Sequence, residues 1–133
     1  MYTKDDLETF FDAYVEAALF STNDESDERG GEPLDANYGP EDLSEQAEDK
    51  MIADCKKFLD RAWPLIEEAP DLIERYPKVD IAGGDFWFTR NGHGTGFWAH
   101  GWPKEIGQKL TQLAKRFGET NLYVGDDGTI DSD

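Results

Sequence analysis

Residues 84–98 read Gly-Asp-Phe-Trp-Phe-Thr-Arg-Asn-Gly-His-Gly-Thr-Gly-Phe-Trp, the stretch of this chain that is richest in aromatic residues and glycines. On either side of residues 91–96 the side chains are mostly aromatic or β-branched, which is typical of strands. Residues 91–96 alternate polar residues with glycine, which is typical of turns because glycine tolerates positive φ. We therefore predict a hairpin over residues 84–100, with its tip at 90–96.

Helical patterns flank this hairpin. Apolar side chains recur with a period near 3.6 residues after Thr3, after Ser44 and after Pro103, which indicates three amphipathic helices. Thr3 and Ser44 are favourable N-caps, proline is favourable at a helix start, and Gly118 is the expected C-terminal cap. Pro64 lies inside the second pattern, where it removes a hydrogen-bond donor, so we expect a kink or a short break there.

The remaining segments predict short elements. We expect a short helix over residues 71–76 and a second hairpin in which 122–124 pair with 129–130; residues 79–81 either add a strand or simply lead into the first hairpin. Helices followed by hairpins, without regular strand–helix alternation, indicate the α+β class. The predicted fold is a single domain over residues 1–133, with three or four helices packed on a small antiparallel sheet that consists of the Gly/aromatic hairpin and the C-terminal hairpin.

Acidic residues dominate the charge of the chain. It has 13 Lys+Arg against 30 Asp+Glu, a formal net charge of −17, and residues 1–50 hold 16 of the acids with only 3 bases. Residues 21–40 have little apolar content and predict an acidic, partly mobile loop, with mobility expected at least across 23–32. A negative field of this size repels nucleic acid and anionic membranes, and it favours a basic partner.

Several kinds of site are not expected. The single cysteine, Cys55, excludes an intramolecular disulfide or a CxxC site and fits a reducing cytoplasm. No segment is apolar enough for a membrane span, and the N-terminus lacks a leader pattern. The two histidines are too few for a typical zinc site, residues 126–131 lack the spacing of a calcium loop, and no cofactor motif is present. We therefore predict a cytoplasmic protein with no metal and no cofactor.

The sequence resembles a family of small, uncharacterised proteins encoded by tailed bacteriophages. Four stretches carry the resemblance: DFWFTRNGHGTGFW at 85–98, KRFGE at 115–119, LYVGDDG at 122–128 and GEPLDANYGPEDL at 31–43. It implies a phage early or accessory protein that acts in the cytoplasm of the infected host, and it brings no established activity. The family pattern is looser around His100 and Trp102, so no shared site is expected there.

The function that we hypothesise is a non-enzymatic interaction protein that binds and modulates a host or phage protein, as a nucleic-acid mimic or a host-defence inhibitor. Tryptophan and arginine often dominate binding energy, and acidic side chains can imitate phosphates and speed association. The predicted contacts at the hairpin are Trp87, Arg90, Asn91, His93 and Trp98. The predicted acidic surface consists of Asp24, Glu25, Asp27, Glu28, Glu32, Asp35, Glu41 and Asp42.

Two alternatives stay open. A small hydrolase or ligand-binding module could use His93 and Arg90 at the hairpin tip, although Asp85 would lie too far along a strand to orient His93. The aromatic residues could instead stack on bases, with Arg90 on a phosphate. Direct nucleic-acid binding is disfavoured because the net charge has the wrong sign. The sequence does not indicate an oligomeric state.

Overall fold

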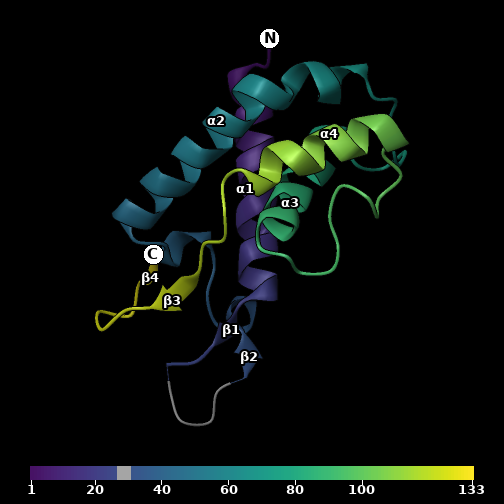
Figure 1. Ribbon diagram of the computed structural model, residues 1–133. Helices are drawn as coiled ribbons and strands as arrows, with labels where there is room; N and C mark the ends of the chain where they lie inside the picture. Colours follow the sequence, from purple (N-terminus) through teal and green to yellow (C-terminus); the bar gives the residue numbers. More distant parts are fainter. Residues whose placement is uncertain (27–30) are drawn as a thin grey trace.

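The computed structural model describes residues 1–26 and 31–133, and within them it has four α-helices and two small antiparallel sheets (Figure 1). The α+β prediction is confirmed. The elements are α1 (Lys4–Ser21), β1 (Asn23–Asp24), β2 (Glu32–Pro33), the 3-10 turns η1 (Leu34–Ala36) and η2 (Pro40–Asp42), α2 (Glu45–Glu68), α3 (Lys78–Arg90), α4 (Lys104–Lys115), β3 (Leu122–Val124) and β4 (Ile130–Ser132).

The predicted helix boundaries follow from local capping. Thr3 and Asp6 form a reciprocal capping box, in which Thr3 Oγ1 accepts from the Asp6 N–H at 3.1 Å. Ser44 caps α2 by accepting from the Ala47 N–H, also at 3.1 Å. α2 is not broken at Pro64, although its axis changes direction in its C-terminal half (Figure 1). None of the described helices combines the length and apolar character needed to cross a bilayer.

The predicted Gly/aromatic hairpin over residues 84–100 is wrong. Residues up to Arg90 belong to α3, and residues 91–103 form the loop that leads to α4. Val79, Ala82 and Phe86 are buried at helical spacing, and α3 packs against α1 along much of its length. Burial against α1 therefore overrides the strand preference of the aromatic residues.

Close approach of the two helices depends on Gly83. A Cβ built at this position would lie 2.2 Å from the backbone oxygen of Phe10, so only glycine allows α1 and α3 to meet there. Residues 79–81 form neither a strand nor a lead into a hairpin, the two alternatives that the sequence left open, because they lie in the first turn of α3. The predicted helix over 71–76 is also wrong: this segment is a turn closed by a bridge between Ile73 and Tyr76.

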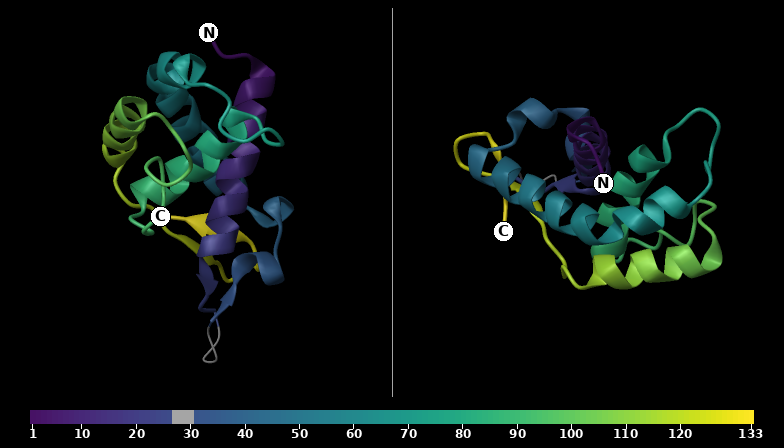
Figure 2. Two further views of the ribbon diagram at one scale, coloured as in Figure 1. Left: turned by 90° about the vertical axis from the view of Figure 1, so that its right-hand side faces the viewer. Right: turned by 90° about the horizontal axis from the view of Figure 1, so that it is seen from above.

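The core is an aromatic cluster at the centre of the helices. Phe58 of α2 stacks on Phe86 of α3 with ring centroids 4.2 Å apart, and Phe10 of α1 lies within 6 Å of both rings. α4 covers the side of α2 and α3 that faces away from α1 (Figure 2). Stacked and tilted rings at these separations add to the free energy of burial.

Both sheets lie at the C-terminal end of α1 (Figures 1 and 2). In one sheet Asn23 pairs with Pro33; in the other, the predicted C-terminal hairpin, Val124 pairs with Ile130. The Ser44 N–H donates to the Ile130 carbonyl at 2.8 Å, which ties this hairpin to the start of α2. The predicted mobile segment 23–32 thus includes paired strand residues at both ends, and its residues 27–30 lie outside the described part of the chain.

Candidate functional site

The five predicted hairpin residues do not form one site. Trp87, Asn91 and His93 border a cleft of about 520 Å³, which we call the polar cleft because hydroxyl, amide and carboxylate groups line most of it. Trp87 is itself buried and donates its indole N–H to Ser21 Oγ at 2.8 Å. Of the three, His93 is the exposed one, so the polar cleft offers an imidazole, and no arginine is among the described residues that line it.

Arg90 is not a surface contact. Its guanidinium is buried, and its Nη1 lies 2.8 Å from the Asp54 carboxylate and 3.1 Å from the Tyr14 hydroxyl. Its remaining donors reach the carbonyl oxygens of Gly118 at 2.9 Å and Phe117 at 3.1 Å, at the end of α4. Arg90 therefore joins α3 to α1, to α2 and to the residues that directly follow α4, and it does not lie on the surface as the predicted contact with a ligand or partner requires.

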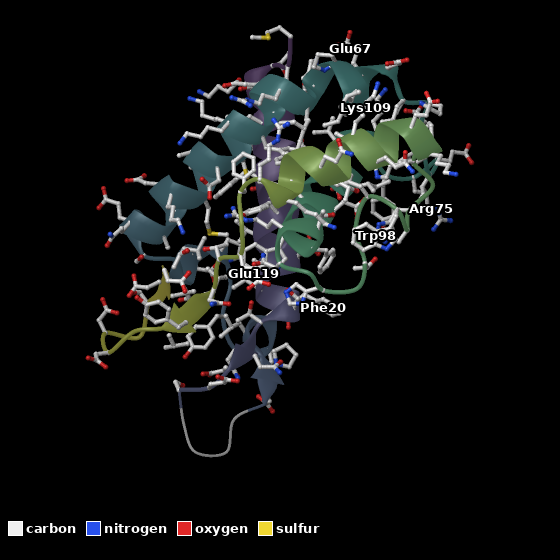
Figure 3. All side chains as sticks on the ribbon, in the orientation of Figure 1. Phe20, Glu67, Arg75, Trp98, Lys109 and Glu119 are labelled. Atoms are coloured by element: carbon white, nitrogen blue, oxygen red, sulfur yellow. The ribbon has the colours of Figure 1, made fainter. Side chains whose placement is uncertain are left out.

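Trp98 is exposed, but it borders a different cleft. It lies in the loop between α3 and α4, where 54% of its surface is accessible (Figure 3). With Trp102 and the α4 residues Gln108 and Gln112 it lines a cleft of about 690 Å³. The residues predicted as contacts at the hairpin thus border two separate clefts, and Arg90 is buried.

The predicted acidic residues gather toward one end of the molecule, because β1 and β2 lie at the C-terminal end of α1, η1 packs against α1, and η2 leads from there to the start of α2 (Figure 1). We call this region the acidic end. Its described members are Asp24, Glu25, Glu32, Asp35, Glu41 and Asp42, which are exposed or half-buried. Asp27 and Glu28 belong to the predicted set but lie outside the described residues.

A cleft of about 450 Å³ between α1, α3 and the turn at residues 71–76 combines carboxylates with apolar side chains, and we call it the acidic cleft. Its chemistry is set by the carboxylates of Glu16, Asp35, Asp80 and Asp85 and by the apolar groups of Phe20, Ile73, Tyr76, Ile81 and Phe88. None of the described lining residues is lysine or arginine. Asp35 also belongs to the acidic end, so the two negative surfaces are continuous.

Three of the apolar residues around the acidic cleft are unusually exposed. Phe20 is 62% accessible, Ile73 47% and Tyr76 56%, and all three line the same cleft. Figure 3 shows Phe20 projecting from the last turn of α1. Single exposed apolar residues are ordinary, but several that converge on one concavity mark a binding surface.

At one wall of the acidic cleft, Asp85 is held by two residues from the following loop. Asp85 Oδ1 lies 2.5 Å from His100 Nδ1, and Asp85 Oδ2 accepts from the Trp102 indole N–H at 2.8 Å. Burial raises the pKa of the Asp85 carboxyl, and the hydrogen bond from Trp102 and the imidazole of His100 partly offset this rise. The loop path is fixed by Thr89, whose Oγ1 accepts from the Phe97 N–H at 3.3 Å.

The Asp85–His100 pair can orient a proton acceptor. With Nδ1 bonded to a carboxylate, the Nε2 atom of a neutral imidazole is the free acceptor, as in general-base catalysis. The described residues lining the acidic cleft include no serine, threonine or cysteine that could act as a nucleophile beside it. The pair therefore offers proton transfer to or from water or a ligand.

Sequence reasoning missed this cluster. The hairpin prediction placed Asp85 on a strand, far from the tip. In the structure Asp85 lies on α3 and faces the following loop, which carries His100 and Trp102. The usable signal was the helical spacing of Val79, Ala82 and Phe86. The path of the loop after Arg90 depends on tertiary contacts and has no local signal.

Asp80 shows that negative charge in the acidic cleft is electrostatically unfavourable. Burial, and then the charge of Asp12, raise the pKa of the Asp80 carboxyl above its ordinary value. A cationic group in the cleft would counter both effects. Among the described residues, no group of three or more His, Cys, Asp or Glu side chains is arranged to hold a metal ion.

The chain has no match among protein-family models, curated proteins or solved structures.

Proposed function

We propose that this chain is a phage-encoded interaction protein that binds a basic segment of a host or phage protein in the acidic cleft. The observation that supports the proposal most directly is the convergence of Phe20, Ile73 and Tyr76 on one concavity. The same concavity contains the carboxylates of Glu16, Asp35 and Asp80, whereas that of Asp85 is buried at its wall. Apolar and aromatic anchors supply most of the energy of a typical interface, and an acidic rim selects a cationic partner. The occupant is a peptide segment that places lysine or arginine beside an apolar side chain.

The acidic end extends this surface. Asp35 belongs to both the acidic end and the acidic cleft. The negative potential that attracts a basic partner to the acidic end therefore extends into the cleft. This arrangement fits a mimic of nucleic acid, in which carboxylates stand in for phosphates on the basic surface of the partner. The resemblance of the sequence to tailed-phage proteins supports action in the cytoplasm of an infected bacterium, where modulation of a host protein, including a defence protein, would benefit the phage.

A hydrolase is the second candidate, and one observation favours it. Asp85 orients His100 at the wall of a cleft, which is the arrangement of a general base and its carboxylate. A pairing of His93 with Arg90 does not support this alternative, because Arg90 is buried. If the protein is a hydrolase, His100→Ala abolishes turnover, whereas an interaction protein shows no turnover to lose.

Capture from bacterial lysate tests the proposal. The immobilised chain should retain a protein at low salt and release it at high salt, and lysates of infected and uninfected cells distinguish a phage partner from a host partner. Tyr76→Ala should weaken binding of the purified partner by roughly 30-fold, the effect of removing an interface hot spot of about 2 kcal/mol.

Glu105→Gln is the matched control, because Glu105 is an exposed carboxylate of α4 that does not line the acidic cleft. It should leave affinity within about twofold of the unsubstituted chain. A partner that binds equally well to the Tyr76→Ala and unsubstituted proteins would show that the acidic cleft is not the contact.

A further inference from the structure

A further concave surface lies between α2 and α4, and its charge is opposite to that of the acidic cleft. This groove of about 420 Å³ is lined by Lys57, Phe58, Asp60, Arg61, Leu113, Arg116 and Phe117, and we call it the basic groove. Lys57 and Arg61 are one turn apart on α2, and Arg116 follows the last turn of α4. Three cations therefore surround one concavity in a chain whose net charge is −17.

The positive charge extends along both helices. Residues 56–61 and 104–116 together contain seven of the 13 Lys+Arg residues and only two of the 30 Asp+Glu residues. Lys109 lies one turn before Leu113 on α4, on the side near α2 (Figure 3). The local potential of the groove is therefore set by cations, despite the net charge of the molecule.

The acidic side chains beside the groove already have partners. Asp54 is ion-paired with the buried Arg90 at 2.8 Å, and Asp60 accepts the hydroxyl of Tyr2 at 2.5 Å. The hydrogen bond to Asp60 raises the pKa of Tyr2 to about 12. Lys57, Arg61 and Arg116, in contrast, form no ion pair with any carboxylate in the described part of the chain. Their donors are available to a ligand.

The floor of the groove is apolar and aromatic. Leu113 and Phe117 are half-buried, so part of each side chain faces the groove, above the buried ring of Phe58. A groove with a cationic rim and an apolar floor fits a ligand in which an anionic group is covalently linked to a planar, largely apolar ring. The fork of an arginine matches two oxygens of a phosphate, and the groove volume lies within the range of about 300–1,000 Å³ found for small-molecule sites.

We propose that the basic groove binds a phosphorylated ligand of nucleotide size, with its phosphates on Lys57, Arg61 and Arg116 and its base over Leu113 and Phe117. This site is separate from the acidic cleft, and its occupant has the opposite charge. The two proposals are independent, because a ligand in the basic groove requires no residue of the acidic cleft.

Calorimetric titration of the purified full chain with ATP, pyrophosphate and adenosine tests the proposal. ATP should bind, and both pyrophosphate and adenosine should bind at least tenfold more weakly, since each lacks one half of the ligand. Arg61→Ala and Arg116→Ala should each weaken ATP binding by roughly tenfold or more, the effect of losing a charge-assisted hydrogen bond.

Arg75→Ala is the charge-matched control: Arg75 is exposed and does not line the groove. Its ATP affinity should equal that of the unsubstituted chain, as should that of Tyr76→Ala. The proposal is overturned if ATP does not bind, if pyrophosphate binds as tightly as ATP, or if Arg75→Ala weakens binding as much as Arg61→Ala. Self-association that Arg61→Ala abolishes would also overturn it, because the groove would then take the acidic end of a second copy.

Discussion

Arg90 shows how far the role of one side chain depends on the element that carries it. On a hairpin tip it would be an exposed binding residue, but at the end of α3 it is buried and its guanidinium lies 5.5 Å from the ring centroid of Phe117. Its ion pair with Asp54 and its bonds to the end of α4 satisfy a charge that would be very costly to bury alone.

Replacing Arg90 should therefore affect stability before any binding. Arg90→Ala leaves Asp54 and two carbonyl groups without their partner, and should lower the free energy of unfolding by about 3–5 kcal/mol in urea denaturation. Arg90→Lys should recover little of this, because an ammonium cannot reproduce the planar fork. Arg75→Ala, at an exposed position, should stay within about 0.5 kcal/mol of the unsubstituted chain; an equal loss in both variants would contradict the structural role of Arg90.

Asp80 predicts a stability that depends on pH. Its folded-state pKa is raised above 3.8 by burial and by Asp12, so the folded state holds the proton more tightly than the unfolded state. The contribution of Asp80 to stability is then fully present below pH 3.8 and is lost as the pH rises through its folded-state pKa. Asp80→Asn should have a higher Tm than the unsubstituted chain at pH 7, with the difference disappearing near pH 3.

The same substitution should weaken binding of a basic partner, since it removes a carboxylate from the acidic cleft. A gain in Tm together with a loss of affinity is the pattern expected where function maintains unfavourable charge. Thermal unfolding at several pH values measures the first effect. An unchanged difference in Tm between pH 3 and pH 7 would show that Asp80 ionises normally in the folded protein.

At the scale of elements, local signals predict the boundaries of helices better than the identity of the central one. The caps at Thr3 and Ser44 act within a few residues, so the sequence alone is sufficient to find them. α3 differs because its buried side chains do not form one stripe: α1 and the loop at residues 91–103 cover it on several sides. Its aromatic residues also have a strand preference. Its helical state depends on packing against α1, and the local signal for it is limited to the helical spacing of Val79, Ala82 and Phe86.

Gly83 and Gly84 form a matched pair that tests this packing. Gly83→Ala places a methyl group 2.2 Å from Phe10 O and should lower the free energy of unfolding by about 1–3 kcal/mol as the helices separate. Gly84→Ala meets no atom closer than 3.9 Å and should raise stability by up to about 1 kcal/mol, because alanine favours the helix. Urea denaturation of both variants measures the difference. If residues 84–89 were a strand, the two substitutions would not differ in this direction.

At the scale of the whole molecule, the charge is divided between separate surfaces. The acidic surface was predicted because the composition of residues 1–50 shows it directly. The basic groove was not predicted, because the net charge of −17 does not show that cations from two helices meet in one place. The acidic cleft was predicted only through Asp35, since Phe20, Ile73 and Tyr76 come from segments that meet only in the folded chain. Long-range contacts create the site, and a single sequence does not report them.

Because the negative charge is spread over the acidic end and the acidic cleft, we expect the two surfaces to affect different rate constants for binding of a purified basic partner. The double substitution Glu41→Gln with Asp42→Asn removes charge outside the cleft, and should lower the association rate constant several-fold at low salt with little effect on dissociation. Tyr76→Ala removes a desolvated anchor and should act almost entirely by speeding dissociation, since short-range contacts form after encounter.

Surface plasmon resonance across a range of salt concentrations separates the two effects. In the double variant the slope of the association rate against ionic strength should become shallower, because fewer charges steer the encounter. In Tyr76→Ala that slope should match the unsubstituted chain. If the double variant keeps the full slope, Glu41 and Asp42 do not face the partner, and the carboxylates of the acidic cleft provide the attraction.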